Sequence, residues 1–369
     1  MSEYAFKVSY FKNLDAFRFF SFLSVFFGHT LMLGTPSNLV IGFLRTFITM
    51  PFLVVPFFFT LSSFLITYRL LIEKGKNSRI DILKFYKNRI LRIWPAYYLL
   101  IIICFVILPL TAYLINIPPP TLPSILPFLL FYANFYMIEN GVAFTFALTI
   151  LWSISIEEQF YLVWVWVLKL FSKKILPWLI ILLFICSIAF SYYYLIELHK
   201  SANNLVIHSF YVLQNFCTGA LMAVICFQKQ KVFKFLNKLH PATLFSVYLI
   251  LPVAYFFIQD IVLLNIIKSL CYSFIIYDQC FNERRFFNAG KFAFLNYLGK
   301  ISYGLYLYHA LVFVILQKQF DFFKNQPTTW TNLFQVLTCF IFTFIVAHLS
   351  YRYIESKFLA LKSTRHSLP

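Results

Sequence analysis

The sequence is poor in charged residues and especially in acidic ones. Only 12% of its 369 residues are charged, and 13 of these are Asp or Glu, whereas an average soluble domain has about 25% charged residues. Hydrophobic residues make up 61% of the chain, which is more than one water-soluble core of this length can bury. The composition therefore excludes a soluble enzyme, a disordered chain and a secreted disulfide scaffold.

The sequence also lacks the usual motifs of nucleotide and metal sites. It has no glycine-rich phosphate loop and no zinc-knuckle spacing, and its seven cysteines stand singly in apolar runs. Such cysteines are typical of membrane-core residues, not of metal ligands or disulfides. We therefore expect no metal. The net charge of +18 indicates the Lys and Arg excess of cytoplasmic loops rather than a nucleic-acid surface.

Long apolar runs are what the chain does contain, and they predict an all-α polytopic membrane protein. Each span needs about 20 residues. The apolar run Leu126–Tyr136 is too short to cross a bilayer, so it predicts a re-entrant or interfacial helix. We expect a single membrane domain, residues 1–369, with ten spans at about 17–34, 50–71, 90–115, 147–170, 176–197, 206–227, 242–259, 261–280, 293–317 and 333–354.

The distribution of basic residues predicts the orientation. With the N-terminus inside, most Lys and Arg residues fall in the inner loops and tails, including the run from Lys74 to Arg92, and few fall in the outer loops. This bias places both termini in the cytoplasm. Heavy use of Phe, Ile, Lys and Tyr is typical of an AT-rich bacterial genome, so we expect a multi-pass protein of the bacterial inner membrane.

Ionisable residues inside predicted spans mark candidate functional positions, because they are expensive in a bilayer. Arg18 and His29 fall on one face of the first span, about 16 Å apart along the helix axis. Arg89 and Arg92 open the third span and also share a face, and such a pair suits bidentate phosphate contact. The structural alternatives are an interfacial anchor, a hydrogen-bonded core histidine and ordinary positive-inside residues.

The fourth span and the late spans add further polar residues. Ser153, Glu157 and Tyr161 form a stripe at i, i+4 and i+8, which is typical of a wet, hydroxyl-binding cavity, although carboxylates at a helix N-terminus also gain from the helix dipole. The late spans carry Lys300, Tyr303, Tyr306, Tyr308, His309, His348 and Glu355. Each of these residues alone is more often structural, but together they predict a polar interior.

The order of these motifs resembles the acyltransferase-three family of integral-membrane acyltransferases, nearly from end to end. Ala16 and Ser63 stand where that family has Gly, and the Pro expected after Glu355 is missing; these are packing positions. The extracytoplasmic hydrolase-like domain of some relatives is not expected here. The matching segments are Leu14–Arg18 with His29, Pro56–Ile66, Phe85–Tyr98, Leu151–Tyr161, Ile301–His309 and Tyr351–Glu355.

The resemblance implies a membrane-bound O-acyltransferase that uses a cytoplasmic acyl-CoA, by default acetyl-CoA, and delivers the acyl group to a hydroxyl at the outer side. It implies that the CoA phosphates are held by Arg18, Arg89 and Arg92. His29 would then act as general base or as a transient acyl carrier.

The remaining candidate residues have secondary roles in this interpretation. His309 is a second candidate base or the hub of a tyrosine network. Glu157 would orient the acceptor hydroxyl, and the substrate-binding candidates beside it are Ser153, Tyr161 and Tyr303.

The expected partners are an acyl-CoA, an extracytoplasmic glycan and the lipid bilayer. The first interpretation of the function is O-acetylation of a cell-surface polysaccharide such as O-antigen or capsule. Alternative acceptors are peptidoglycan, a lipid or a small metabolite. A lipid-linked glycan transporter or flippase is a different class, which the lack of a visible inverted repeat disfavours.

Overall fold

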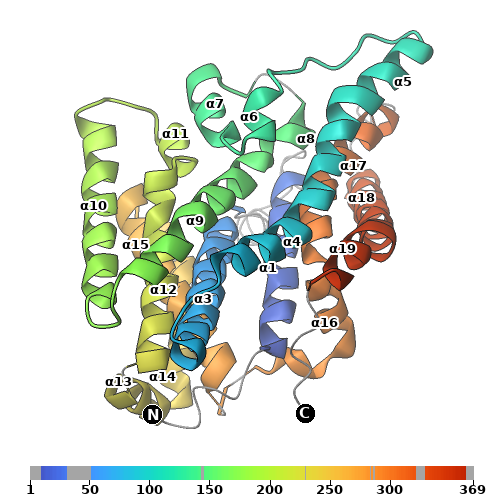
Figure 1. Ribbon diagram of the computed structural model, residues 1–369. Helices are drawn as coiled ribbons and strands as arrows, with labels where there is room; N and C mark the ends of the chain where they lie inside the picture. The colour runs from blue at the N-terminus through green and yellow to red at the C-terminus, as the bar shows by residue number, and fades with distance from the viewer. Residues whose placement is uncertain are drawn as a thin grey trace. The chain divides into compact units, whose positions relative to one another are not determined.

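The computed structural model describes residues 10–30, 51–142, 145–228, 230–282, 284–285, 287–320 and 329–362. Every regular element within these ranges is a helix, which confirms the predicted all-α class (Figure 1). The helices belong to two compact units. Unit 1 comprises Met1–Ser21, Phe52–Ile80 and Gln159–Gly299, and unit 2 comprises Phe22–Pro51, Asp81–Glu158 and Lys300–Pro369.

Unit 1 is built mainly from the middle of the chain. Helices α10, α12 and α15 pack against one another within it (Figure 1). Its elements are the start of α1 (Lys12–Thr30), α3 (Pro51–Asn77), the second half of α9 (Leu151–Leu170), α10 (Leu176–Ile196), α11 (Ala202–Val206), α12 (Ser209–Gln228), α13 (Gln230–Lys238), α14 (Pro241–Phe257), α15 (Ile261–Phe281), η4 (Ala289–Lys291) and α16 (Ala293–Lys300).

Buried amides fix how α12 and α15 pack. The side chain of Asn265 donates a hydrogen bond to Gln214 Oε1 (3.0 Å), and Asn215 donates to Asn265 Oδ1 (3.3 Å). All three residues are fully buried. Because a buried amide without a partner is costly, these bonds stabilise one register of the two helices.

The packing of α3 depends on one glycine and on aromatic side chains. A Cβ atom on Gly219 of α12 would lie 2.1 Å from the carbonyl oxygen of Thr60, so only glycine lets the two backbones approach this closely. Further along α3, the rings of Phe64 and Tyr68 lie nearly parallel with centroids 5.8 Å apart. Both rings belong to the buried core of unit 1.

Unit 2 combines a central segment of the chain with its C-terminal part. Within it α17 packs against α18, α8 and α4, and η6 packs against α4. Its elements are the end of α1, α4 (Ile82–Ile102), the π-helix η3 (Ile103–Ile107), α5 (Leu108–Leu114), α6 (Leu126–Leu129), α7 (Ala133–Asn140), α8 (Phe146–Thr149), the first half of α9, α17 (Ser302–Phe320), α18 (Thr329–Ser350), the π-helix η6 (Tyr351–Glu355) and α19 (Ser356–Ala360).

The third predicted span begins earlier than expected. The Asp81 carboxylate accepts a hydrogen bond from the backbone N–H of Lys84 (2.9 Å), which caps α4 at its N-terminus. From there α4, η3 and α5 form one apolar segment of 33 residues, Ile82–Leu114. The Arg89 and Arg92 pair therefore lies inside the helix, two turns after its start, and not at its end.

The single re-entrant or interfacial helix predicted over Leu126–Tyr136 is wrong. The segment forms two short helices, α6 and α7, separated at Phe131, which has a positive φ of 56°. The hydroxyls of Tyr97 and Tyr98 donate to the carbonyl oxygens of Phe128 (2.7 Å) and Leu129 (3.0 Å). These side-chain bonds satisfy the carbonyls at the end of α6, so the helix does not need to continue.

Six helices of the described residues are long and apolar enough to cross a membrane, or eight if the bent pairs α13–α14 and α16–α17 each count as one span. The first and fourth predicted spans, α1 and α9, are not among them, because both carry charged and amide side chains in their first halves. Residues 31–34 of the first predicted span lie outside the described residues. The count of ten spans and the cytoplasmic termini stay predictions.

Candidate functional site

Two distant histidines meet in unit 2. Nδ1 of His29, near the end of α1, lies 2.9 Å from Nε2 of His309 in α17. The ring planes are parallel to within 1°, and the ring centroids are 5.1 Å apart. Because the centroids are so much farther apart than the nitrogens, the rings meet edge to edge, as an N–H···N hydrogen bond requires. The structure thus brings together the two histidines that the sequence offered as rival bases.

The hydrogen bonds of His309 determine which nitrogen carries each proton. Its Nδ1 lies 2.6 Å from the carbonyl oxygen of Tyr306, which can only accept, so Nδ1 is protonated. In the neutral ring Nε2 is then the acceptor, and His29 must donate from its own Nδ1. His29 consequently keeps an unprotonated Nε2, the nitrogen that a base or nucleophile needs.

Aromatic rings and hydroxyls surround this pair. Phe146 contacts the His29 ring edge-on with centroids 5.0 Å apart, and Phe22 contacts His309 at 6.1 Å. His309 is only 2% exposed, whereas His29 is partly accessible. The more accessible ring is therefore the one with the unprotonated nitrogen.

The predicted Ser153 and Glu157 approach the same pair through Tyr306. Ser153 Oγ lies 2.7 Å from Tyr306 Oη, and Glu157 interacts electrostatically with Tyr306. Tyr306 was not a predicted site residue, although its position three residues before His309 placed it on the same helix face. We call His29, His309, Tyr306, Ser153 and Glu157 the histidine cluster.

The arginines on α4 form a second cluster in unit 2. The guanidinium carbon of Arg89 lies 5.7 Å from the centroid of the Phe85 ring, one turn earlier on α4. Trp94 Nε1 donates a hydrogen bond to Glu158 Oε2 (3.1 Å), and Glu158 interacts electrostatically with Arg89. Glu158 thus has the defined contact to α4, whereas the sequence had favoured its neighbour Glu157.

Glu355 supplies a second carboxylate near this arginine pair. It lies buried at the end of the π-helix η6, accepts a hydrogen bond from Ser350 Oγ (3.2 Å) and interacts electrostatically with Arg92. A Cβ atom on Gly304 of α17 would lie 3.2 Å from Glu355 Oε1, so glycine makes room for the carboxylate. Glu355 is the buried residue of this π-helix, and π-helical turns are frequent at functional sites.

The predicted substrate residue Tyr303 belongs to the same group of side chains as the two carboxylates. Its hydroxyl donates to the carbonyl oxygen of Ile93 (2.9 Å), and it interacts electrostatically with both Glu158 and Glu355. This places Tyr303 with the donor candidates rather than with the acceptor candidates. We call Arg89, Arg92, Glu158, Glu355 and Tyr303 the arginine cluster.

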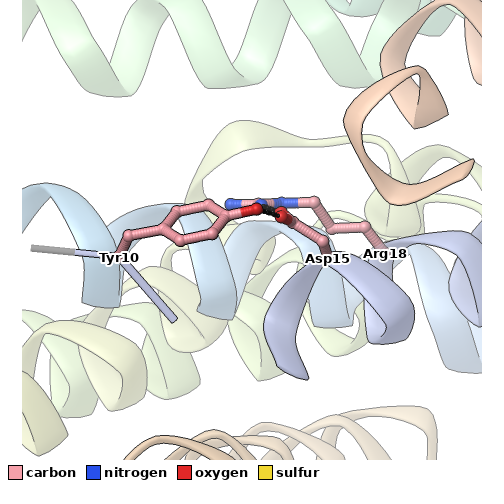
Figure 2. A network of polar contacts seen from close by, with 3 residues as sticks. All are labelled: Tyr10, Asp15 and Arg18. Atoms are coloured by element: carbon pink, nitrogen blue, oxygen red, sulfur yellow. Dashed lines mark hydrogen bonds and ion pairs between the residues drawn. The ribbon is translucent and has the colours of Figure 1, made fainter. Parts of the chain in front are cut away.

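Two predicted site residues belong to unit 1 instead. Arg18 donates to Asp15 Oδ1 (2.5 Å) one turn earlier in α1, and Tyr10 also donates to this carboxylate. Figure 2 shows the three side chains converging at the start of α1. Tyr161 Oη lies 2.5 Å from Ser62 Oγ of α3. Arg18 therefore already has a carboxylate partner, and its donor role stays a prediction, as does the substrate role of Tyr161.

Comparison with known protein families agrees with the motif order. A family model described as an acyltransferase domain matches residues 11–352. The chain belongs to this acyltransferase family. The match covers both units and includes every residue of the histidine cluster, although Glu355 of the arginine cluster lies just beyond it. Family membership and the apolar helices together show a multi-pass membrane protein.

Relatives in this family are named for O-acetyl transfer. The O-acetyltransferase OatA of Staphylococcus aureus is 29% identical over 83% of this chain and 52% of its own length. The peptidoglycan O-acetyltransferase OatA of Listeria monocytogenes is 25% identical over 83% of this chain and 51% of its own length. The chain thus spans about half the length of the curated relatives it matches. No solved structure matches it.

Proposed function

We propose that this membrane protein is an O-acetyltransferase that moves an acetyl group from acetyl-CoA to a hydroxyl of an extracytoplasmic glycan. The observation that carries the proposal is the hydrogen bond between His29 and His309, which leaves Nε2 of His29 unprotonated at the accessible edge of the pair. A neutral imidazole of this kind is suited to general base catalysis.

In the proposed reaction, the unprotonated Nε2 of His29 acts as the general base. Nε2 of His29 takes the proton of the acceptor hydroxyl while the hydroxyl oxygen attacks the thioester carbonyl. The carbon–sulfur bond then breaks, the acetyl ester forms, and the CoA thiolate takes the proton back from His29. His309 does not touch the substrate in this scheme: it holds His29 in the required tautomer and stabilises the transient imidazolium.

A second route uses the same nitrogen as a nucleophile. Nε2 of His29 attacks the thioester carbonyl, the carbon–sulfur bond breaks and CoA leaves as the thiolate. The acceptor hydroxyl oxygen then attacks the acyl carbon, the carbon–nitrogen bond to His29 breaks, and the hydroxyl proton is released to neutralise the thiolate. This route suits a donor and an acceptor that reach His29 in turn. It makes the same demand on His309, since Nδ1 of His29 must again remain the donor.

The arginine cluster is the proposed donor site. Arg89 and Arg92 supply two guanidinium groups for the CoA phosphates, and guanidinium binds phosphate in a bidentate manner. Tyr303 in this cluster and His309 in the histidine cluster are six residues apart on α17, about 9 Å along the helix. A donor bound at the arginines thus lies close to the proposed base.

The names of the relatives favour peptidoglycan as the acceptor over O-antigen or capsule. The Listeria monocytogenes relative is named a peptidoglycan O-acetyltransferase. A surface polysaccharide, the first interpretation from the sequence, also offers sugar hydroxyls and remains the competing acceptor in the test.

The test measures transfer of labelled acetyl groups from acetyl-CoA by membranes that contain the full chain. Peptidoglycan fragments and a capsular polysaccharide are offered as separate acceptors. We expect label on the peptidoglycan fragments, loss of that label in His29→Ala, and wild-type transfer in the matched control His348→Ala, a histidine of unit 2 outside both clusters. Label on the polysaccharide alone would change the acceptor, and no transfer to either would contradict the proposal.

A further inference from the structure

Helix α13 of unit 1 belongs to neither cluster and differs from the helices on each side of it. It follows the apolar helix α12 and packs against it (Figure 1). The chain then bends by 89° into α14. α14 has 17 apolar and small polar residues, which is already enough to cross a bilayer. Because a helix perpendicular to a span lies along the membrane plane, α13 lies at the membrane surface.

The bend between α13 and α14 is fixed by local sequence. Nδ1 of His240 accepts a hydrogen bond from the backbone N–H of Ala242 (3.2 Å), which caps α14 at its N-terminus. Pro241 follows His240 as the first residue of α14, a position that needs no N–H. A residue before proline avoids the helical region, and His240 is extended, with φ −63° and ψ 139°. α13 therefore cannot continue straight into α14.

The inner face of α13 is packed against α15. Leu236 is buried, and the ring of Phe233 lies edge-on to the rings of Tyr277 and Phe281, with centroids 6.0 and 5.4 Å away. The hydroxyl of Tyr277 also donates a hydrogen bond to Oδ1 of Asn237 (2.5 Å). These contacts fix the rotation of α13 about its own axis.

That rotation leaves two apolar side chains exposed beside three lysines. Phe235 is 61% exposed and Val232 is 38% exposed, and they share one side of the helix because they are three residues apart. The exposed residues Lys231, Lys234 and Lys238 fall within an arc of about 60° next to Phe235. Lysines beside an exposed apolar strip are typical of a helix that lies in the bilayer interface.

The charge around α13 is of one sign. The sequence contains no Asp or Glu between Glu197 and Asp260. Lys173 adds a further ammonium group at the start of α13, since its Nζ lies 5.2 Å from the ring centroid of Phe227 in the last turn of α12. α13 falls in a predicted inner loop, and the cytoplasmic leaflet of a membrane carries anionic lipids. The surface of α13 is therefore complementary to lipid phosphates.

We propose that α13 is an interfacial helix that binds anionic lipids. Val232 and Phe235 insert between the acyl chains, while Lys231, Lys234 and Lys238 contact the lipid phosphates. A soluble phosphate compound such as CoA offers the same charge but no acyl chains for Phe235, so the exposed apolar pair favours a lipid. This inference concerns unit 1 alone and does not depend on the proposed acetyl transfer.

The first test measures binding of phosphatidylglycerol to the purified full chain by native mass spectrometry. We compare the wild type with the triple variant Lys231→Gln, Lys234→Gln and Lys238→Gln. The affinity for phosphatidylglycerol should fall about tenfold to a hundredfold, and the affinity for phosphatidylcholine should not change. The matched control is Lys84→Gln, Lys87→Gln and Lys357→Gln, which removes three exposed lysines of unit 2 and should bind both lipids like the wild type.

The second test measures the depth of α13 in nanodiscs of phosphatidylcholine and phosphatidylglycerol. A spin label is attached to Phe235→Cys or, as the control one residue earlier, to Lys234→Cys, each in a background in which the exposed Cys186 is replaced by Ala. The label at position 235 should relax mainly with oxygen, which dissolves among the acyl chains. The label at position 234 should relax mainly with a water-soluble nickel complex.

The outcomes separate this inference from the proposed function. Unchanged phosphatidylglycerol binding in the α13 triple variant, or a water-exposed label at position 235, would overturn the inference and leave the lysines as topology signals. Weaker CoA binding with unchanged lipid binding would assign the lysines to CoA and also overturn it. Absence of acetyl transfer by the wild type would contradict the proposed function alone.

Discussion

The histidine cluster and the arginine cluster lie in the same unit but are built in opposite ways. In the histidine cluster the polar atoms bond to one another directly, with His29 to His309 at 2.9 Å and His309 to the Tyr306 carbonyl at 2.6 Å. In the arginine cluster the two carboxylates accept hydrogen bonds from Trp94 and Ser350 and interact electrostatically with the arginines. Direct bonds between the histidines fix a tautomer, whereas the guanidinium groups of the arginine cluster supply positive charge suited to an anion.

Two adjacent residues of α9 belong to different clusters. Glu157 interacts with Tyr306 of the histidine cluster, and Glu158 interacts with Trp94 and Arg89 of the arginine cluster. Consecutive residues of a helix differ in direction by about 100°, so one Glu-Glu pair serves two environments. The comparison predicts that substitutions in the histidine cluster change the rate of transfer, whereas substitutions in the arginine cluster change the affinity for CoA.

The largest effect is expected for His29→Ala. If His29 is the base, its loss should slow acetyl transfer by roughly 10² to 10⁴-fold. Binding of CoA should change little, because the arginine cluster is untouched. The two quantities are measured on the same preparation, as labelled acetyl transfer and as the dissociation constant of CoA. Retention of more than about a tenth of the activity would move the base role to His309.

The sequence predicted much of this arrangement from polar residues in apolar runs. It predicted the all-α class, which the structure confirms, and it singled out His29, His309, Arg89 and Arg92 as candidates, whose roles stay predictions. It could not predict that the two histidines bond to each other, because 280 residues separate them and the contact depends on how α1 and α17 pack. The sequence offered the two histidines as alternative bases, whereas in the structure they form one hydrogen-bonded pair.

Other misses have local physical causes. Glu158 was overlooked because a stripe at i, i+4 and i+8 selects Glu157, and nothing in the spacing shows that Trp94 reaches the next residue. Glu355 was predicted as part of the polar interior but was given no role, because it lies in a π-helix, whose altered turn shifts a side chain away from the direction that α-helical spacing predicts. The break between α6 and α7 depends on hydroxyls from α4, which no local pattern in that segment reveals.

The second largest effect concerns the arginines. Arg89→Ala and Arg92→Ala should each weaken CoA binding by about tenfold to a hundredfold, since a charge-assisted hydrogen bond contributes about 1.5–3 kcal/mol. Lysine at either position should restore only part of the affinity, because it lacks the planar fork. Transfer at saturating acetyl-CoA should remain close to that of the wild type. Unchanged CoA affinity would reduce the pair to a topology signal.

A smaller effect on the rate is expected for His309→Gln. Glutamine can accept a hydrogen bond from Nδ1 of His29, but it lacks the ring that the Tyr306 carbonyl anchors. His29 should then be held less precisely, and transfer should fall by roughly tenfold to a hundredfold with little change in CoA affinity. His309→Ala should be more severe, because no acceptor remains. If both variants match the wild type, His309 does not position His29.

The smallest effect is expected for Trp94→Phe. This variant tests most directly how the arginine cluster differs from the histidine cluster. The substitution removes the hydrogen bond that anchors Glu158 but leaves the charge of Glu158 in place. It also keeps an aromatic ring beside Tyr98 and Phe131, whose ring centroids lie 5.6 and 5.8 Å from that of Trp94. Without this hydrogen bond the Glu158 carboxylate competes more strongly with phosphate for Arg89, so CoA binding should weaken about two- to fivefold. Glu158→Gln is expected to change the same dissociation constant in the opposite direction. Trp178→Phe, an exposed tryptophan of α10, is the matched control and should change nothing. Tighter CoA binding in Trp94→Phe would contradict this expectation. It would mean that the hydrogen bond itself limits the affinity for CoA, and not the position in which that bond holds Glu158.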